Sequence, residues 1–185
     1  MFGVVKYLIA AVCVLMAGCS DAEKPPVPRR TAYPRVRLLP AEYVVPQGLP
    51  LPFAVNAYAS ASVGEKSDGS VWLTIWYPSY GATAYFTFTP VSAATAAEVM
   101  DNRAHRMALN LGAAAAQSYS FATATGMQAT VLQSPTAAGA AVQALAVGNG
   151  WVVSASSVFP AAAADSIAPM VQAVTDDFIT SLKKL

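Results

Sequence analysis

Hydrophobic and polar residues alternate in several short runs between residues 53 and 159, and this period of two predicts β-strands. The clearest run is 70–77, where Val71, Leu73, Ile75 and Tyr77 alternate with Trp72, Thr74 and Trp76. The other runs that predict strands are 53–62, 82–89, 117–124, 127–133, 140–147 and 151–159. Between the last two, Gly148-Asn149-Gly150 favours a tight hairpin turn with positive φ.

Two segments carry the three- and four-residue spacing of amphipathic helices. The first begins at Thr95-Ala96-Ala97-Glu98, which fits a capping box. Its apolar stripe is Met100, Ala104, Met107 and Leu111. The second begins at Asp165 or Ser166, with Pro169 in its first turn. Its apolar stripe is Ile167, Met170, Val171, Val174, Phe178 and Leu182, and we expect Asp176, Asp177 and Thr180 to face outward.

The order of elements is therefore strands, a helix, four strands and a second helix. We predict an α+β fold in which an antiparallel β-sheet of about six to seven strands is flanked by two helices as an α/β/α sandwich. Because run 70–77 is apolar on both faces, we expect both of its faces to be covered. The order resembles the PsbP-like fold, a likeness of architecture that carries no function.

The N-terminus has the pattern of a secretory signal peptide. Lys6 precedes an apolar run over residues 7–18, which is too short to span a membrane stably. Residues 15–19, Leu-Met-Ala-Gly-Cys, look like a bacterial lipobox, so we expect residues 1–18 to be removed and Cys19 to be lipidated, for instance by palmitate. Two or three acyl chains would anchor the protein stably. The alternative is a plain signal peptide with an incidental cysteine.

Residues 19–51 are predicted to be a tether, and residues 52–185 a single domain. The tether contains seven prolines, which favour an extended, semi-rigid chain. It also carries the candidate partner-binding residues Arg29, Arg30, Tyr33, Arg35, Arg37 and Tyr43. They either form a solvated spacer or contact anionic headgroups, a cell-wall polymer or a partner protein. The apolar residues in its second half predict that this half lies partly against the domain.

Composition excludes several classes of function. Loss of Lys6 with the signal peptide leaves ten basic and ten acidic residues, which argues against a nucleic-acid partner. With Cys13 removed and Cys19 lipidated, no thiol remains for a metal site or a nucleophile. His105 is the only histidine and has no nucleophile motif beside it. We therefore expect no metal, no cofactor and no enzymatic activity, with an enzyme built on His105 as the weakest alternative.

The aromatic residues offer a second functional hypothesis. Trp72 and Trp76 share one face of their predicted strand and, with Tyr80, could line a site for a small ligand or a glycan. The alternative is that the two indoles pack in a core under a helix. Exposed indole rings would favour the ligand site, and buried ones would exclude it.

Several short motifs resemble the gliding-motility lipoprotein GldD family. They are Pro28-Arg29, Tyr33-Pro34-Arg35, Leu39-Pro40 with Tyr43, Leu51-Pro52-Phe53, Trp72, Tyr77-Pro78-Ser79-Tyr80, Ala82-Thr83, Ala104-His105, the run 150–159 and Asp165-Ser166-Ile167-Ala168-Pro169. The resemblance covers most of the chain after Cys19.

This resemblance implies a non-enzymatic lipoprotein of the cell envelope that supports gliding motility and the linked type IX secretion apparatus through protein–protein contacts. Its implied partners are the membrane, through the acyl chains, and envelope proteins of that apparatus. We expect it at the outer membrane, facing the periplasm. Ser20-Asp21-Ala22-Glu23 weakly resembles acidic signals that direct some lipoproteins to the cell surface, which is the alternative location.

Overall fold

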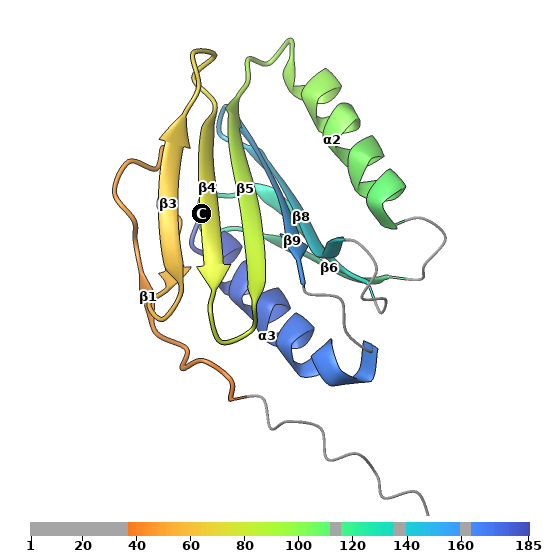
Figure 1. Ribbon diagram of the computed structural model, residues 1–185. Coiled ribbons are helices and arrows are strands. Elements are labelled where there is room, and N and C mark those ends of the chain that lie inside the picture. The colour runs from red at the N-terminus through yellow and green to blue at the C-terminus, as the bar shows by residue number, and fades with distance from the viewer. Residues whose placement is uncertain (1–36, 112–115, 135–139, 160–163) are drawn as a thin grey trace, which may run out of the picture. The chain divides into compact units, whose positions relative to one another are not determined.

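The computed structural model describes residues 37–111, 116–134, 140–159 and 164–185. Seven strands in these residues form one antiparallel sheet, in the order β3-β4-β5-β9-β8-β7-β6 (Figure 1). The strands are β3 (Ser60–Glu65), β4 (Val71–Tyr77), β5 (Ala82–Pro90), β6 (Gln117–Ala122), β7 (Gln128–Gln133), β8 (Ala140–Gly148) and β9 (Trp151–Val158). Together with the helices α2 (Ala96–Leu111) and α3 (Ala164–Lys183), they confirm the predicted α+β fold.

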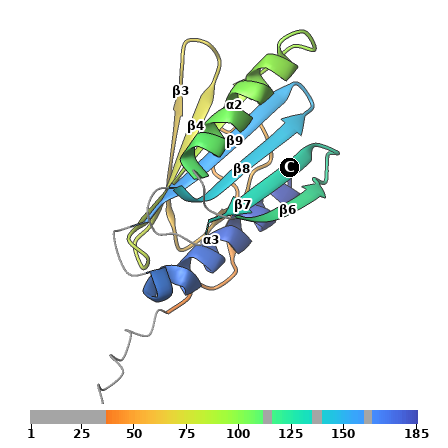
Figure 2. The same cartoon turned by 90° about the vertical axis from the view of Figure 1, so that its right-hand side faces the viewer.

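The sheet consists of two blocks of consecutive hairpins, β3-β4-β5 and β6-β7-β8-β9, joined where β5 pairs with β9. After β5, the chain must cross the sheet to reach β6 at the far edge. Helix α2 makes this crossing and lies over β8 and β9 (Figure 2). Helix α3 follows β9 and packs on β7 and β8 from the opposite face.

The turn between β8 and β9 is the predicted tight hairpin. Gly148 pairs with Trp151, which leaves Asn149 and Gly150 as a two-residue loop. Both have positive φ, 53° for Asn149 and 76° for Gly150, as a type I′ turn requires.

The predicted strand over 53–62 is instead two strands separated by a turn. Val55–Asn56 forms β2, which pairs with β1 (Tyr43–Val44) in a small second sheet, and the chain then turns into β3. The side-chain oxygen of Asn56 accepts a hydrogen bond from the backbone N–H of Tyr58 at 3.0 Å. Asparagine makes turns of this kind readily, which explains why the strand is broken there.

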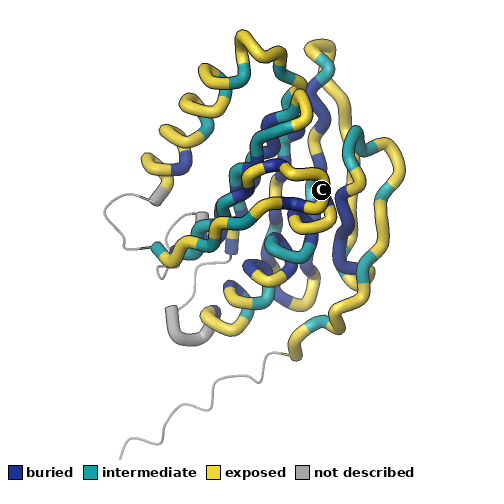
Figure 3. Tube along the Cα trace, turned by 180° about the vertical axis from the view of Figure 1, so that it is seen from behind, coloured by how far each residue is buried: buried dark blue, intermediate teal, exposed yellow. Residues whose placement is uncertain are grey.

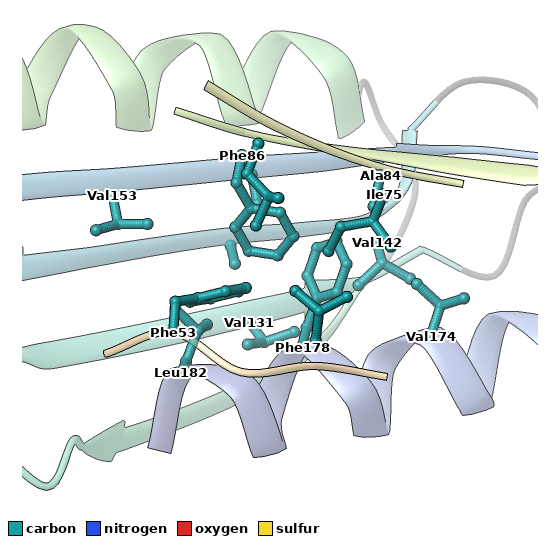
Figure 4. Close-up of a cluster of buried hydrophobic side chains, with 14 of the residues drawn as sticks. Phe53, Ile75, Ala84, Phe86, Val131, Val142, Val153, Val174, Phe178 and Leu182 are labelled. Atoms are coloured by element: carbon teal, nitrogen blue, oxygen red, sulfur yellow. The ribbon is translucent and has the colours of Figure 1, made fainter. Parts of the chain in front are cut away.

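The main core lies between α3 and one face of the sheet. The predicted stripe of α3 is confirmed, since Ile167, Val171, Val174, Phe178 and Leu182 are all buried. Phe178 packs against Phe86 of β5 with ring centroids 4.7 Å apart, and Phe53 lies equally close to Phe86 (Figure 4). Such tilted aromatic pairs add to the stabilisation from area burial.

Helix α2 begins at Ala96, as a capping box that opens at Thr95 predicts, but its side-chain cap is a different pair of residues. The backbone N–H of Ser92 donates to the Thr95 hydroxyl at 3.0 Å, and the Thr95 N–H is 3.3 Å from the Ser92 hydroxyl. The reciprocal cap is therefore Ser92 with Thr95, not Thr95 with Glu98. The predicted apolar stripe is also shifted, because Met100 and Ala104 are exposed while Val99 and Arg103 turn inward and Met107 is buried.

Strand β4 is covered on one face only, so the expectation of cover on both faces is wrong. Leu73, Ile75 and Tyr77 are buried under α3, whereas Trp72 and Trp76 on the other face are exposed. The crossing from β5 to β6 explains the difference, because it carries α2 over β8 and β9 and leaves β3 and β4 open. The exposed colour along α2 shows how few of its residues are enclosed (Figure 3).

Candidate functional site

The predicted lipidation site and most predicted partner-binding residues lie outside the described part of the chain. These are Cys19, Arg29, Arg30, Tyr33 and Arg35. Arg37 is described and exposed, and Tyr43 is half-buried. The division into a tether over 19–51 and a domain over 52–185 stays a prediction.

Residues 37–51, called the docked segment below, contact the domain at several points. The backbone N–H of Leu39 donates to the Tyr80 hydroxyl at 2.9 Å. Asn56 donates its side-chain amide to the carbonyl oxygen of Pro40 at 3.0 Å. The Ala57 N–H donates to the Glu42 carbonyl at 2.8 Å, beside the β1–β2 pair. Leu39, Leu49 and Leu51 pack against the core.

Asp177 of α3 holds this segment, contrary to the expectation that it faces outward. Its side chain is only 8% exposed, and its Oδ1 accepts a hydrogen bond from the Tyr43 hydroxyl at 2.7 Å. Burial raises the pKa of Asp177, and hydrogen bonds from Tyr43, Asn56 and Tyr77 oppose the rise. Asp176, its neighbour, is exposed, so the two carboxylates do not act as a pair.

The tyrosines around Asp177 are also perturbed. Burial, followed by the hydrogen bond to Asp177, raises the pKa of Tyr43 to about 12. Burial raises the pKa of Tyr77 well above its ordinary value. These phenols stay protonated and act as hydrogen-bond donors rather than as acids or bases.

A hollow of about 390 Å³ lies beside this network. Its lining includes Leu38, Leu39 and Tyr43 from the docked segment, and Pro169 and Ala173 from α3. The hollow is mostly apolar, and Asp176 and Asp177 are its acidic groups. The hollow therefore lies at the interface between the docked segment and α3, close to the first described residues of the chain.

Trp72 and Trp76 form an exposed aromatic pair on the other face of the sheet. Their side chains are 44% and 41% exposed. Tyr80 does not join them: it is 4% exposed, its ring stacks on Tyr77 and its hydroxyl is bonded to Leu39. Tyr85 of β5 is the aromatic residue on their face, since it pairs with Thr74 between the two tryptophans and is exposed.

Two arginines of α2 stand above the same face. Arg103 and Arg106 line a hollow of about 170 Å³ with Tyr85, Thr87, Ser154 and Ser156 of β5 and β9. They also line an adjoining hollow of about 360 Å³ with Lys66 and Thr89. The Lys66 ammonium lies over the Trp72 ring, 4.4 Å from its centroid. This face thus combines aromatic rings, hydroxyls and cations.

The remaining chemistry is sparse. His105 is exposed on α2. In the described ranges, no three His, Cys, Asp or Glu side chains come close enough to hold a metal ion. Neither described helix is both long enough and apolar enough to cross a membrane.

A model of the family described as gliding motility lipoprotein GldD matches residues 23–185. The chain belongs to the GldD lipoprotein family. No curated protein and no solved structure matched it. As a GldD protein, it is a lipoprotein associated with gliding motility, and its family is an accessory one with no known enzymatic activity. A lipoprotein family also implies lipid anchoring in the cell envelope.

Many of the residues that resemble GldD gather at one place in the structure. Leu39, Tyr43 and Phe53 belong to or follow the docked segment, and Tyr77 and Tyr80 contact it or its hydrogen-bond partner Asp177. Pro169 lines the hollow from α3. These GldD motifs therefore lie where the docked segment meets the domain.

Sequence reasoning missed Tyr85, Arg103 and Arg106 as a group on the face of Trp72. The alternation along 82–89 places Tyr85 and Thr87 on one face, and hairpin pairing puts them beside the tryptophans. The arginines gave a weaker signal, because their place above β5 depends on a strand order that the sequence does not contain.

Proposed function

We propose that this GldD protein is a lipid-anchored accessory protein of the cell envelope, tethered through Cys19 to the outer membrane and facing the periplasm. It supports gliding motility and the type IX secretion machinery through protein–protein contacts and catalyses no reaction. The family membership carries this proposal. The partner-binding strip is the tether, with Arg29, Arg30, Tyr33, Arg35 and Arg37 as its contact residues.

The docked segment supports this assignment. Tyr43 is half-buried and bonded to Asp177, so its role is to position the segment rather than to reach a partner. Arg37, by contrast, is exposed just before the segment meets Tyr80 through Leu39. The domain thus holds one end of the strip, which lowers the entropy lost when a partner binds.

A pull-down from envelopes tests the strip. We expect the Arg29→Ala/Arg30→Ala/Arg35→Ala/Arg37→Ala variant, expressed at normal abundance, to lose envelope partners that the wild type captures. Lys183→Ala removes an exposed cation at the end of α3 and serves as the control. If the four-arginine variant captures the same partners as the wild type, the strip does not bind them and this part of the proposal is wrong.

Fractionation and mass spectrometry test the anchor. Wild-type protein should carry acyl chains on Cys19 and sediment with membranes, whereas Cys19→Ala should not be acylated at this position. A wild type whose Cys19 thiol is free of lipid would contradict the anchor.

A second candidate function is the binding of a small ligand or a glycan at Trp72 and Trp76. Their exposure favours it, because large aromatic side chains that cover no core are a feature of binding surfaces. The apolar faces of sugar rings stack on flat indoles. Trp72→Ala/Trp76→Ala should abolish glycan binding while Tyr58→Ala, at an exposed tyrosine in the β2–β3 turn, should not.

A further inference from the structure

The surface between α2 and the open part of the sheet is called the α2 trough here. Its floor is Tyr85 and Thr87 of β5 with Ser154 and Ser156 of β9, and its wall is Arg103 and Arg106 of α2. Thr87 pairs with Trp72 across β4 and β5, so the aromatic pair continues the same floor. In the strand direction, Trp72 and Trp76 are about 13 Å apart, which exceeds the length of one sugar ring.

The two arginines of the α2 trough repel each other electrostatically. Among the described residues, the charge that acts most on the Arg103 guanidinium is that of Arg106, which has the same sign. Burial, followed by this repulsion, lowers the pKa of Arg103. Its one hydrogen bond to a described side chain is a long one, 3.5 Å to the Thr89 hydroxyl. Among the described residues, most of its five N–H donors therefore have no acceptor.

Charge around the trough also favours an anion. The described residues that line the two hollows include three cations, Lys66, Arg103 and Arg106, and a single carboxylate, Glu98. Paired guanidinium groups bind carboxylates through parallel, charge-assisted hydrogen bonds. Partial burial strengthens such bonds, because water screens them less.

The groups on the floor of the α2 trough favour a sugar over a peptide as the ligand. Peptides commonly bind sheets by adding a strand at an edge, where backbone groups are unpaired. The α2 trough lies instead over β4, β5 and β9, whose backbone groups are paired within the sheet. Only side chains can bind a ligand here. Hydroxyls, a phenol and two indoles match the hydroxyls and flat apolar faces of sugars.

We propose that the α2 trough binds a carboxylated polysaccharide, with the acid group at Arg103 and Arg106 and neighbouring sugar rings on Trp72 and Trp76. This inference rests on the second candidate function and adds the chemical class of the ligand. It assigns Tyr85, Thr87, Ser154 and Ser156 to hydrogen bonds with the sugar hydroxyls.

Isothermal titration of the full-length protein in detergent tests the proposal, with polygalacturonate as the carboxylated probe. Neutral dextran tests the need for the acid group, and polyglutamate tests the need for the sugar. We expect polygalacturonate to bind at least tenfold more tightly than either control, and to bind more weakly as salt is raised. Undetectable binding of polygalacturonate, or equal binding of polyglutamate, would overturn the proposal.

Variants separate the arginine site from the aromatic site. Arg103→Gln/Arg106→Gln should weaken polygalacturonate binding about tenfold or more, while Lys183→Gln/Lys184→Gln, with the same change in charge, should leave it unchanged. Trp72→Ala/Trp76→Ala should also weaken it. Loss in the tryptophan variant alone would overturn the acid site and leave the glycan-binding function standing. Loss in the arginine variant alone would overturn glycan binding at the two tryptophans and, with it, the proposal of a carboxylated polysaccharide.

Discussion

The two helices cover the sheet very differently. Five apolar side chains of α3 are buried against β4, β5, β7 and β8, and aromatic rings from three separate segments meet there. Helix α2 buries Met107 and half-buries Val99 and Arg103, while Leu109 is 67% exposed. The contact between α2 and β8 is also partly polar, because the Gln143 side chain donates a hydrogen bond to the Met107 carbonyl at 3.3 Å.

This difference separates stability from recognition. Apolar burial stabilises a fold in proportion to the area removed from water, so the α3 face carries most of the stability. The α2 face leaves aromatic rings and guanidinium groups accessible, at a small cost in stability. Functional surfaces commonly depart in this way from the best packing. We therefore expect substitutions under α3 to cause large losses of stability and substitutions on α2 to cause small ones.

The largest expected effect is at Phe178. Phe178→Ala leaves a cavity between α3 and Phe86 and should lower the free energy of unfolding by about 3–5 kcal/mol. Met107→Ala, the corresponding change on α2, should cost about 2 kcal/mol, and Leu109→Ala less than about 0.5 kcal/mol. Urea unfolding measures all three. Equal losses for Phe178→Ala and Met107→Ala would remove the contrast between the two faces.

A smaller effect is expected at the docked segment. Tyr43→Phe removes the hydrogen bond to Asp177 and should cost about 2 kcal/mol, because a buried carboxylate loses a donor. Hydrogen exchange should quicken at the amides of Leu39 and Ala57, whose hydrogen bonds to Tyr80 and Glu42 join the docked segment to the domain. Tyr85→Phe is the matched control, at an exposed tyrosine on the other face of the sheet. Unchanged exchange at both amides would show that the bond does not hold the segment.

The pH dependence of stability tests Asp177 more finely. Because burial raises its folded pKa above the ordinary value of 3.8, the folded state binds the proton more tightly than the unfolded state. Its contribution to stability is thus fully present below pH 3.8 and is lost as the pH rises through the folded pKa. The free energy of unfolding of the wild type, minus that of the Asp177→Asn variant, should therefore increase as the pH falls from 7 toward 4. If this difference in free energy stays constant or decreases as the pH falls, the burial of this carboxylate would be contradicted.

The smallest effect is expected at Arg103. Arg103→Gln removes a like charge beside Arg106 and loses only a long bond to Thr89, so stability should be unchanged or rise by up to about 0.5 kcal/mol. Thermal unfolding against Lys183→Gln, an exposed cation on α3, measures the change. A loss above about 1 kcal/mol would mean that Arg103 serves the fold rather than the α2 trough.

Local patterns predicted the parts of the fold that depend on local physics. The stripe of α3 and the Asn149-Gly150 turn were confirmed, because periodicity and positive φ are properties of neighbouring residues. The start of α2 at Ala96 was also predicted correctly, although Ser92 with Thr95 forms the reciprocal cap in place of Thr95 with Glu98. The strand at 53–62 was broken by the side chain of Asn56.

The candidate sites depend on contacts between distant residues. The alternation in 70–77 indicated that both faces of the strand are apolar, yet only the path of α2 decides that Trp72 and Trp76 are exposed. Asp177 looked like a surface residue because its donor, Tyr43, lies 134 positions earlier in the chain. Long-range pairings of this kind are not encoded in any local window.

The most direct test of the division between the two faces is colony spreading by a gliding bacterium that lacks its own GldD protein and expresses variants of this chain. The variant combines Trp72→Ala, Trp76→Ala, Arg103→Gln and Arg106→Gln, and its control combines the exposed positions Leu109→Ala and Lys183→Gln. Both should reach wild-type abundance in the envelope, and only the first should fail to restore spreading. Wild-type spreading by the first variant would contradict a functional role for the α2 face.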